Sequence, residues 1–448
     1  MNDSANQWLI TNAELVSDGQ RRHADLRIRD GRIDCIAPQL AAGPHERVLD
    51  AAGRWLLPGM IDDQVHLREP GLTHKADIAS ESRACAAGGI TSFMDMPNTR
   101  PPTLDAAALE AKYARAAEVS AVNYAFYLGA SNDNLAQIRA LDPASAPGIK
   151  VFMGASTGNM LVDDPATLDA IFREAPTPII THCEDTPLIL ANEAAARERH
   201  GDDIPASQHP RIRSREACLK STELAISLAR RHGTRLHVLH ISTAEECALF
   251  EPGPLRHKRI TAETCVHFLH FCAEDYPRLG NLIKCNPAIK DAADRAAITR
   301  ALAEGRIDVL ATDHAPHLVS EKSAQYAKAP SGLPLVQFAL QCALERVFDG
   351  LLTLERVVEA VAHAPATLFD VHERGWLREG YHADLVLVDP QRPQLVAASD
   401  VLSKCRWTPF EGQRFRSSIA ATFVNGQRVW DGTQVDPRVR GQRLAFAR

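Results

Sequence analysis

The sequence predicts an α/β fold: a (β/α)8 TIM-like barrel beside a small β-sandwich domain that is built from both ends of the chain. Eight apolar, strand-like runs recur through the middle of the chain with helical patterns between them, an alternation typical of a closed parallel barrel. Residues 1–58 show a pattern of short strands and turns, and residues 371–448 show the same pattern. We therefore expect a barrel at 59–370 and a β-domain whose two parts are 1–58 and 371–448.

The expected barrel strands are short apolar runs, most of which end in a polar side chain. Between them lie helical patterns such as "IASESRACAA" at 78–87 and "KSTELAISLARRHG" at 220–233. Because active sites of such barrels lie at the carboxyl ends of the strands, polar residues there are expected to converge on one rim. The expected strands are 59–66, 90–98, 122–130, 148–155, 178–184, 235–243, 259–265 and 307–314.

Two dipeptides support the expected β-domain. Asp30-Gly31 stands between strand-like runs near the start of the chain, and Asn425-Gly426 does so near its end. Both dipeptides favour the tight turns of β-hairpins because Asn, Asp and Gly tolerate a positive φ. Both ends of the chain therefore contain hairpin-like strands and are expected to form one domain.

The composition excludes several classes of protein. The 448 residues carry a net charge of −6 and no long basic run, which disfavours nucleic acid or an anionic membrane as a partner. No apolar stretch reaches the roughly 18 residues of a membrane span, and the first residues lack the pattern of a secretory signal. The ten cysteines show no paired C-x-x-C spacing, so no disulfide framework or cysteine zinc knot is expected, and a cytoplasmic location fits.

The polar residues at the strand ends point to a metal site. Histidines, a carboxylate and a lysine open to modification at one rim suit one or two divalent ions such as Zn²⁺. Each residue alone has an ordinary alternative, such as a hydrogen-bonded rim histidine, an ion-paired lysine or a helix-capping aspartate. The joint pattern favours the metal site, and its members are Asp62, Gln64, His66, Asn98, Lys150, His182, His240 and Asp313.

Motifs spread over nearly the whole chain carry a family resemblance. They are "PGMIDDQVHLREPGLTHKADI", "MDMPNTRPPT", "IKVFMGAST", "THCED", "HVLHIST", "NPAIKDAADR", "ATDHAPH" and "GYHADLVLVDP". Together they resemble the cyclic amidohydrolases of the metal-dependent amidohydrolase superfamily, and within them the dihydroorotases. The resemblance implies a reversible, zinc-dependent hydrolysis of the cyclic amide of (S)-dihydroorotate to N-carbamoyl-L-aspartate, a reaction of de novo pyrimidine biosynthesis.

The resemblance also implies roles for the metal-site residues. In the family, two metal ions share a bridging hydroxide and a lysine that CO₂ has carboxylated, and Lys150 matches that lysine. His182 and His240 match the ligands of one ion, while His66 and Asp313 match ligands of the other. Asp313 further matches the residue that acts first as general base and then as general acid.

Other positions match the residues that hold the substrate in the family. Arg68, Asn98 and His317 match a clamp for the ring carboxylate, and a guanidinium suits a two-pronged contact of this kind. Asn286 and the backbone near Gly332 match contacts to the ring. For Arg68 the alternative is an ion pair with Glu69 or Asp77, and the matching motifs favour the substrate role.

Gln64 departs from the family pattern, which has a histidine at that position. An amide oxygen is a poor donor to zinc beside imidazole. Asp63 is not expected to replace it, because neighbouring residues of a strand point to opposite faces. The site could keep a second metal ion with fewer protein ligands, its coordination completed by water or Gln64. It could instead use a single ion, or the chain could be an inactive relative. The remaining positions match the family, which favours the first two outcomes.

Three functional hypotheses follow from these residues. The first is a dihydroorotase, and the second is another cyclic amidohydrolase such as a hydantoinase, dihydropyrimidinase or allantoinase. The third, suggested by Gln64, is a non-catalytic dihydroorotase-like partner of aspartate carbamoyltransferase. The resemblance leaves a homodimer open, and residues 318–334 could form a mobile loop that closes over the substrate. His237 and His267 are expected in the core or behind the residues of the site.

Overall fold

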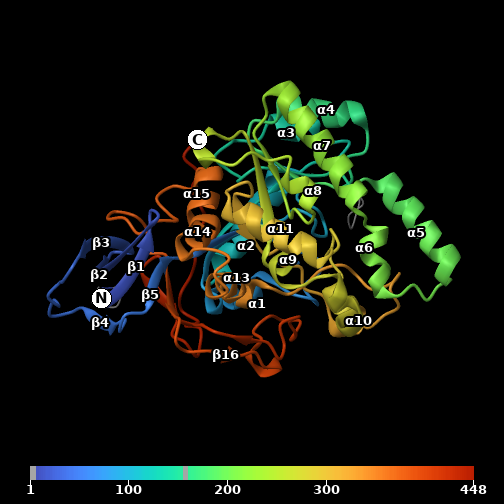
Figure 1. The fold of residues 1–448 in the computed structure, drawn as a ribbon. Helices are drawn as coiled ribbons and strands as arrows, with labels where there is room; N and C mark the ends of the chain where they lie inside the picture. Colours follow the sequence, from blue (N-terminus) through green and yellow to red (C-terminus); the bar gives the residue numbers. More distant parts are fainter. Residues whose placement is uncertain (1–6, 155–159) are drawn as a thin grey trace.

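The centre of the molecule is the predicted barrel of parallel strands (Figure 1), seen in a computed structural model that describes residues 7–154 and 160–448. The strands follow one another around the wall in chain order. The ring closes where β14 returns to β6, through a bridge between Val65 and His314 and a 2.7 Å hydrogen bond from the amide of His66 to the carbonyl of His314. The wall strands are β6 (Met60–Val65), β7 (Ile90–Asp95), β8 (Asn123–Phe126), β9 (Leu128–Gly129), β10 (Ile149–Phe152), β11 (Ile179–His182), β12 (Leu236–Val238), β13 (Ile260–Cys265) and β14 (Val309–Ala311).

Each of the eight expected strands has a counterpart in this wall. The expected strand 122–130 is divided into β8 and β9 at Tyr127. There the Tyr127 amide donates to the carbonyl of Asp95, and its hydroxyl donates across 2.9 Å to the carbonyl of Asp63. The last residue of the expected strand 148–155 lies outside the described residues.

Helices surround the wall, and several begin at a residue that the sequence marks as a cap. Asp77, Asp105, Asp164 and Asp185 each accept a hydrogen bond from a backbone amide in the first turn of the helix that follows. The helices are α1 (Ile78–Ala87), α2 (Ala106–Val119), α3 (Leu135–Arg139), α4 (Pro165–Glu174), α5 (Thr186–His200), α6 (His209–Ile212), α7 (Arg215–His232), α8 (Ala244–Cys247), α9 (Val266–His270), α10 (Tyr276–Leu279), α11 (Ala292–Ala303), α12 (Val319–Lys322), α13 (Ala339–Phe348), α14 (Leu354–Val358) and α15 (Ala364–Leu368).

Strands from the two ends of the chain share one sheet, in the order β19-β18-β15-β5-β1-β2-β3, with β4 beside β1. Its two parts join where β5 pairs antiparallel with β15, and Trp8, Leu26 and Phe423 lie in its own apolar core. The strands are β1 (Trp8–Ser17), β2 (Gln20–Arg29), β3 (Arg32–Ala37), β4 (Arg47–Asp50), β5 (Trp55–Pro58), β15 (Leu385–Asp389), β18 (Ser418–Val424) and β19 (Gln427–Trp430), with a separate pair of β16 (Gln394–Leu395) and β17 (Arg414–Phe415).

Both predicted hairpin turns lie in this sheet. Asp30 and Gly31 connect β2 to β3 with φ of 49° and 79°, and Asn425 and Gly426 connect β18 to β19 with φ of 48° and 75°. Positive φ at both central residues is what a type I′ turn requires. The domain boundaries drawn after residues 58 and 370 stay a prediction.

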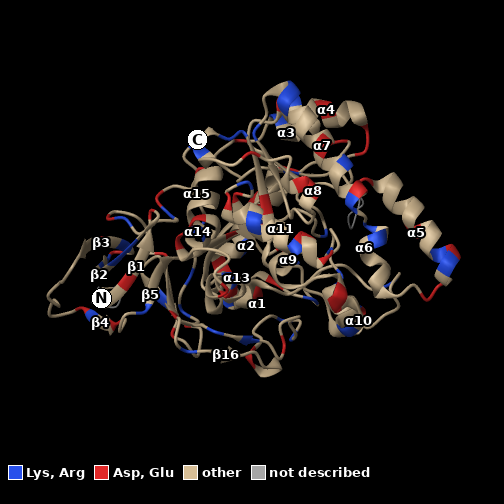
Figure 2. Cartoon of the chain, viewed as in Figure 1, with Lys and Arg blue, Asp and Glu red and all other residues tan. Residues whose placement is uncertain are grey.

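The interior of the barrel is filled at one end only. Ile61, Met94, Tyr127, Ile180 and Phe369 belong to one apolar cluster with residues of α15. Open space is therefore left at the carboxyl ends of the strands, where the sequence predicts the site. In the view of Figure 2, basic and acidic residues are interspersed over the helices, and the described part of the chain holds no helix with the length and apolar character needed to span a membrane.

Candidate metal and substrate site

A cavity of ≈ 260 Å³ opens at the carboxyl ends of the barrel strands. Asp62, also predicted as part of the metal site, does not line this cavity: its buried carboxylate accepts hydrogen bonds from the amide and the hydroxyl of Thr312. The structure brings the other predicted site side chains to this one cavity, although they come from distant parts of the chain. They are Gln64, His66, Arg68, Asn98, Lys150, His182, His240, Asn286, Asp313 and His317.

The cavity has further lining residues that the sequence analysis missed. Phe152 follows Lys150 by two positions in β10, so the period of a strand could have revealed that both face the cavity. Arg213 follows the short helix α6, and no strand-end pattern marks it. Ser331 is a third such residue. Gly332, whose backbone the resemblance already assigned to a ring contact, lines the cavity beside it with φ of 143°, and a Cβ there would lie 2.5 Å from the carbonyl oxygen of Ala315, so only glycine fits.

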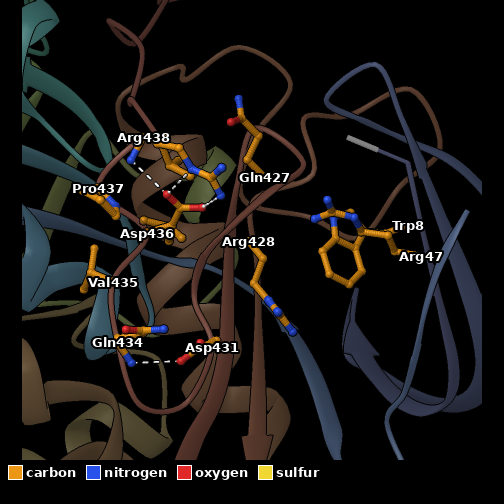
Figure 3. A pocket seen from close by; sticks show the side chains of 12 residues that line it. Trp8, Arg47, Gln427, Arg428, Asp431, Gln434, Val435, Asp436, Pro437 and Arg438 are labelled. Atoms are coloured by element: carbon orange, nitrogen blue, oxygen red, sulfur yellow. Dashed lines mark hydrogen bonds and ion pairs between the residues drawn. The ribbon is translucent and has the colours of Figure 1, made fainter. Parts of the chain in front are cut away.

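A larger cavity of ≈ 510 Å³ lies beside the terminal sheet (Figure 3). Its most distinctive feature is the ring of Trp8, with the guanidinium groups of Arg47 and Arg428 at 5.5 and 4.9 Å from the ring centroid. Asp436 and Arg438 pair with each other there. The described residues that line it include no histidine, cysteine or lysine. Its size therefore does not make it the better candidate for hydrolytic chemistry.

His182 and His240 face each other in the cavity. Nδ1 of His182 lies 2.9 Å from Nε2 of His240. Nε2 of His182 lies 3.0 Å from a carboxylate oxygen of Glu184, although the contact is not aligned as a hydrogen bond. The carboxylate favours the proton on Nε2, which leaves Nδ1 with its lone pair toward His240. Burial, followed by the charges of His182 and Lys150, holds the pKa of His240 well below its usual value.

Glu184 links this pair to Arg213. Burial opposes its ionisation, yet Arg213 and His182 together hold the pKa of Glu184 at about 2. The carboxylate is fully buried and pairs with the guanidinium of Arg213, which lines the cavity. Glu184 thus orients a candidate ligand from behind, as carboxylates commonly do for metal-binding histidines.

His66 and Asp313 form a second pair. Nδ1 of His66 lies 2.8 Å from Oδ1 of Asn98, and because an amide oxygen only accepts, Nδ1 carries the ring proton. Nε2 of His66 then presents a lone pair to Oδ1 of Asp313, 3.2 Å away. Two acceptors at that distance repel each other unless a cation lies beside both, so this pair fits a metal ion.

Lys150 is buried among these groups with only 1 % of its surface exposed. Burial lowers the pKa of its amine to about 8, despite the opposing charges of Asp313 and Glu263. Its nitrogen lies 4.7 Å from the centroid of the Phe152 ring. A neutral amine in this position is a nucleophile for CO₂, whereas an ammonium group would repel a metal ion.

Arg68 and His317 lie together at another side of the cavity. An ammonium group only donates, so the 3.0 Å contact of Lys75 with Nδ1 of His317 places the ring proton on Nε2. That Nε2 lies 3.0 Å from the carbonyl oxygen of Ser331 and 3.0 Å from Nη2 of Arg68. Burial, with the charges of Arg68 and Lys75, holds the pKa of His317 well below its usual value, so two N–H groups converge here.

The carboxylates weighed as structural partners of Arg68 are engaged elsewhere. Glu69 pairs with Arg115 at 2.7 Å, and Asp77 pairs with Lys404 at 2.7 Å. Burial lowers the pKa of Arg68 to about 10, against the attraction of Asp313. The guanidinium is thus a buried cation beside the cavity.

Three lining residues have a left-handed backbone, with φ of 69° at Arg68, 43° at His240 and 50° at Asp313. None is glycine, so each costs about 1–2 kcal/mol. His240 and Asp313 each stand two residues beyond the end of a wall strand, β12 and β14. The turns direct both side chains into the cavity, and strain of this kind is concentrated at functional sites.

Gln64 lines the cavity and Asp63 does not, as expected, but the predicted reason is wrong. The pairing of β6 with β7 shifts register between Asp62 and Val65. This irregularity lets Gln64 reach Asp313 in the cavity while Asp63 contacts His237 in the barrel interior. The two side chains differ in depth and do not lie on opposite faces of the wall.

Known proteins resemble the chain over nearly its full length. A model of the Amidohydrolase family matches residues 55–429. A dihydroorotase of Halobacterium salinarum is 37% identical over 431 residues, which cover 94% of this chain and 96% of that protein. An allantoinase of Solibacter usitatus is 32% identical over 445 residues, which cover 98% of this chain and 96% of that protein.

Solved structures extend the likeness to the fold. An L-hydantoinase (dihydropyrimidinase) from Arthrobacter aurescens superimposes with a TM-score of 0.92 at 28% identity, covering 98% of this chain and 99% of that one. A dihydropyrimidinase from Brevibacillus agri gives a TM-score of 0.88. The chain therefore belongs to the metal-dependent amidohydrolase family, in the cyclic amidohydrolase branch whose members hydrolyse cyclic amides.

Proposed function

We propose that this cyclic amidohydrolase is a dihydroorotase, which hydrolyses (S)-dihydroorotate to N-carbamoyl-L-aspartate and catalyses the reverse ring closure. The convergence of Arg68 and His317 supports this proposal most strongly. Nη2 of Arg68 and Nε2 of His317 lie 3.0 Å apart, and because both carry protons they cannot bond to each other. A carboxylate could accept from the Arg68 guanidinium and share the His317 N–H that now bonds to the carbonyl of Ser331. Dihydroorotate carries such an anion, its ring carboxylate, whereas allantoin, hydantoin and dihydrouracil do not.

The metal ions belong to the same proposal. We assign His182 and His240 to one Zn²⁺ site and His66 and Asp313 to the other, with a carboxylated Lys150 shared between them. The lone pair on Nδ1 of His182 and the facing acceptors of the second pair fit this assignment. When bound, a divalent metal lowers the pKa of water and polarises a carbonyl oxygen.

Lys150 would contribute after modification. Its buried amine attacks CO₂, a C–N bond forms, and one proton leaves, which yields a carbamate with two oxygens and a negative charge. Burial supports the reaction because it favours the neutral amine. The carbamate would replace a cation that repels divalent ions by an anion that binds them.

Asp313 would move the proton. Its Oδ1 is held by the side-chain amide of Gln64 at 3.0 Å and faces Nε2 of His66. The carboxylate accepts a proton from the attacking water and returns it to the ring nitrogen as the amide C–N bond breaks. Asn286 has an amide oxygen that is buried without a hydrogen-bond partner among the described residues, and we assign it to a ring N–H.

The test compares substrates with and without the carboxylate. Purified chain, reconstituted with Zn²⁺ and bicarbonate, is assayed on dihydroorotate, dihydrouracil, allantoin and hydantoin. We expect the highest kcat/KM on dihydroorotate and a loss of about 100-fold or more in Arg68→Gln on that substrate alone. Arg115→Gln removes an exposed guanidinium near Arg68 and is the matched control. A wild-type preference for allantoin or dihydrouracil would overturn the proposal.

A further inference from the structure

Three buried side chains converge in the barrel interior beneath the cavity. They are Asp63 of β6, His237 of β12 and Glu263 of β13, each 0% exposed. One ligand atom from each lies within 4.8 Å of the others. Nε2 of His237 lies 3.3 Å from Asp63 and 3.8 Å from Glu263. Since β6 is not a neighbour of β12 or β13 in the wall, the three side chains meet across the interior.

The facing atoms of this cluster lack hydrogen bonds. Both carboxylate oxygens of Asp63, Oε2 of Glu263 and Nε2 of His237 are buried without a hydrogen-bond partner among the described residues. A buried carboxylate without a partner costs several kcal/mol. The other oxygen of Glu263 has a partner, because it accepts a hydrogen bond from the amide of His240 at 3.3 Å. Oδ2 of Asp63, Oε2 of Glu263 and Nε2 of His237 are therefore unpartnered atoms that lie close together.

The hydrogen bonds around His237 decide which of its nitrogens carries the proton. Thr261 lies 2.8 Å from Nδ1 of His237, and its hydroxyl donates to the carbonyl of Leu236 at 3.1 Å. Because that hydroxyl proton is used, Nδ1 of His237 must donate to Thr261. Nε2 of a neutral ring would thus present a lone pair to two carboxylates, so the cluster must take up a cation. Burial disfavours a proton on His237, but Asp63 and Glu263 raise the pKa of its ring to about 9, so the choice lies between that proton and a metal ion.

The spacing favours a metal ion over an added proton. An imidazolium paired with a carboxylate makes hydrogen bonds of about 2.7–2.9 Å, shorter than the 3.3 and 3.8 Å seen at His237. Around a tetrahedral Zn²⁺ with ligands at about 2.0–2.1 Å, neighbouring ligand atoms lie about 3.3 Å apart. Two carboxylates also balance the charge of one divalent ion, whereas protons would have to occupy both His237 and Glu263, whose pKa burial and Asp63 raise, to reach the same balance.

We propose that Asp63, His237 and Glu263 bind a divalent transition-metal ion, with Zn²⁺ as the probe, at a site separate from the one in the cavity. The ion would join three strands of the wall. Through Glu263 it would also fix the backbone of His240 at the floor of the cavity. Cys265 separates this site from the cavity, because its sulfur lies 3.6 Å from Glu263 and 3.9 Å from Gln64, which lines the cavity.

The test counts metal ions in the full-length protein. Wild type, Asp63→Asn and Glu263→Gln are loaded with Zn²⁺, dialysed and measured by inductively coupled plasma mass spectrometry. We expect each variant to hold one zinc fewer per chain than wild type. His182→Asn alters the cavity site and is the matched control, so Asp63→Asn combined with it should lose zinc additively. An unchanged zinc count in both interior variants would overturn the proposal.

A second measurement does not depend on the variants folding. Crystals of the zinc-loaded wild type, measured on both sides of the zinc absorption edge, should show an anomalous peak about 2 Å from the facing atoms of Asp63, His237 and Glu263. A peak confined to the cavity would overturn the interior site while leaving the proposed function intact. The reverse pattern, a peak in the interior alone, would support it and count against the metal centre of the cavity.

Discussion

The side-chain amide of Gln64 donates a hydrogen bond to Oδ1 of Asp313 across 3.0 Å. The opposite orientation of the amide would set its oxygen against the carboxylate, so the nitrogen belongs on this side. The amide oxygen lies instead 3.9 Å from the sulfur of Cys265. Gln64 thus directs its lone pairs away from the contact between His66 and Asp313.

Replacing Gln64 by histidine should strengthen metal binding, and the wild-type chain should already be active without this change. An imidazole nitrogen would supply the donor that the amide withholds, so Gln64→His is expected to raise zinc affinity or stoichiometry, measured by metal titration. Gln64→Ala removes the amide without adding a ligand and should not raise either. An inert wild type with an active Gln64→His variant would contradict this expectation.

Asp313→Asn should abolish turnover while the fold persists. Asparagine keeps an oxygen for Gln64 but cannot take up a proton, so we expect kcat to fall about 1,000-fold or more. The thermal unfolding midpoint, followed by circular dichroism, should stay within a few degrees of wild type. Turnover within tenfold of wild type would show that another group carries the proton.

Lys75 should act on catalysis through His317. Lys75→Met removes the donor that fixes the ring proton on the nitrogen facing Arg68, so kcat/KM on dihydroorotate should fall about tenfold. KM should account for most of the loss, because the change affects the carboxylate clamp and not Asp313. Lys75→Arg can still donate and should recover most of the activity. Equal effects of both variants would point to a purely structural role.

Removal of metal and of CO₂ should have separable effects. Dialysis against a chelator is expected to abolish activity, and Zn²⁺ with bicarbonate should restore it faster than Zn²⁺ in bicarbonate-free buffer. Intact-protein mass measurement under native conditions should show the added carboxyl group, and Lys150→Ala should lack it. Restoration at the same rate and extent without bicarbonate would count against carboxylation of Lys150.

Stability should fall in weak acid because of His209. Its ring nitrogens contact the Tyr326 hydroxyl and the Cys285 carbonyl, each at 2.7 Å, and burial holds its pKa well below the usual value. The unfolded chain takes up this proton near pH 6.5 and the folded chain does not. Stability is therefore complete above pH 6.5 and is lost below it by about 1.4 kcal/mol per pH unit.

Chemical denaturation at several pH values measures this slope. His209→Gln can replace both hydrogen bonds without titrating, so its slope should be smaller than that of wild type by about 1.4 kcal/mol per pH unit. His23→Gln changes an exposed side chain on β2 and is the control. Parallel slopes for wild type and His209→Gln would show that other groups dominate the acid response.

The sequence predicted what depends on local pattern. The strand runs and the turns at Asp30-Gly31 and Asn425-Gly426 each follow from a few neighbouring residues. The gathering of His66, His182, His240 and Asp313 follows from the barrel, since strand ends must share a rim. These features could be inferred because one rule of backbone geometry fixes each of them.

Features that depend on distant packing could not be predicted. The irregularity in β6, which separates Asp63 from Gln64 in depth, arises in its pairing with β7. The division of the third strand at Tyr127 depends on a hydrogen bond across the barrel. Arg213 reaches the cavity from a loop because Glu184 pairs with it. The residues close to each of these positions in the sequence contain no pattern that would have predicted the feature.

The pairing of β5 with β15 has a consequence for biogenesis. During synthesis β1 to β5 leave the ribosome long before β15 is made, because Pro58 of β5 pairs with Leu385 of β15, which is more than 300 residues later in the chain. Their apolar edge stays open through that interval, a state prone to aggregation. Chaperone demand and sensitivity to premature termination should therefore be governed by the last strands made, far from the chemistry they support.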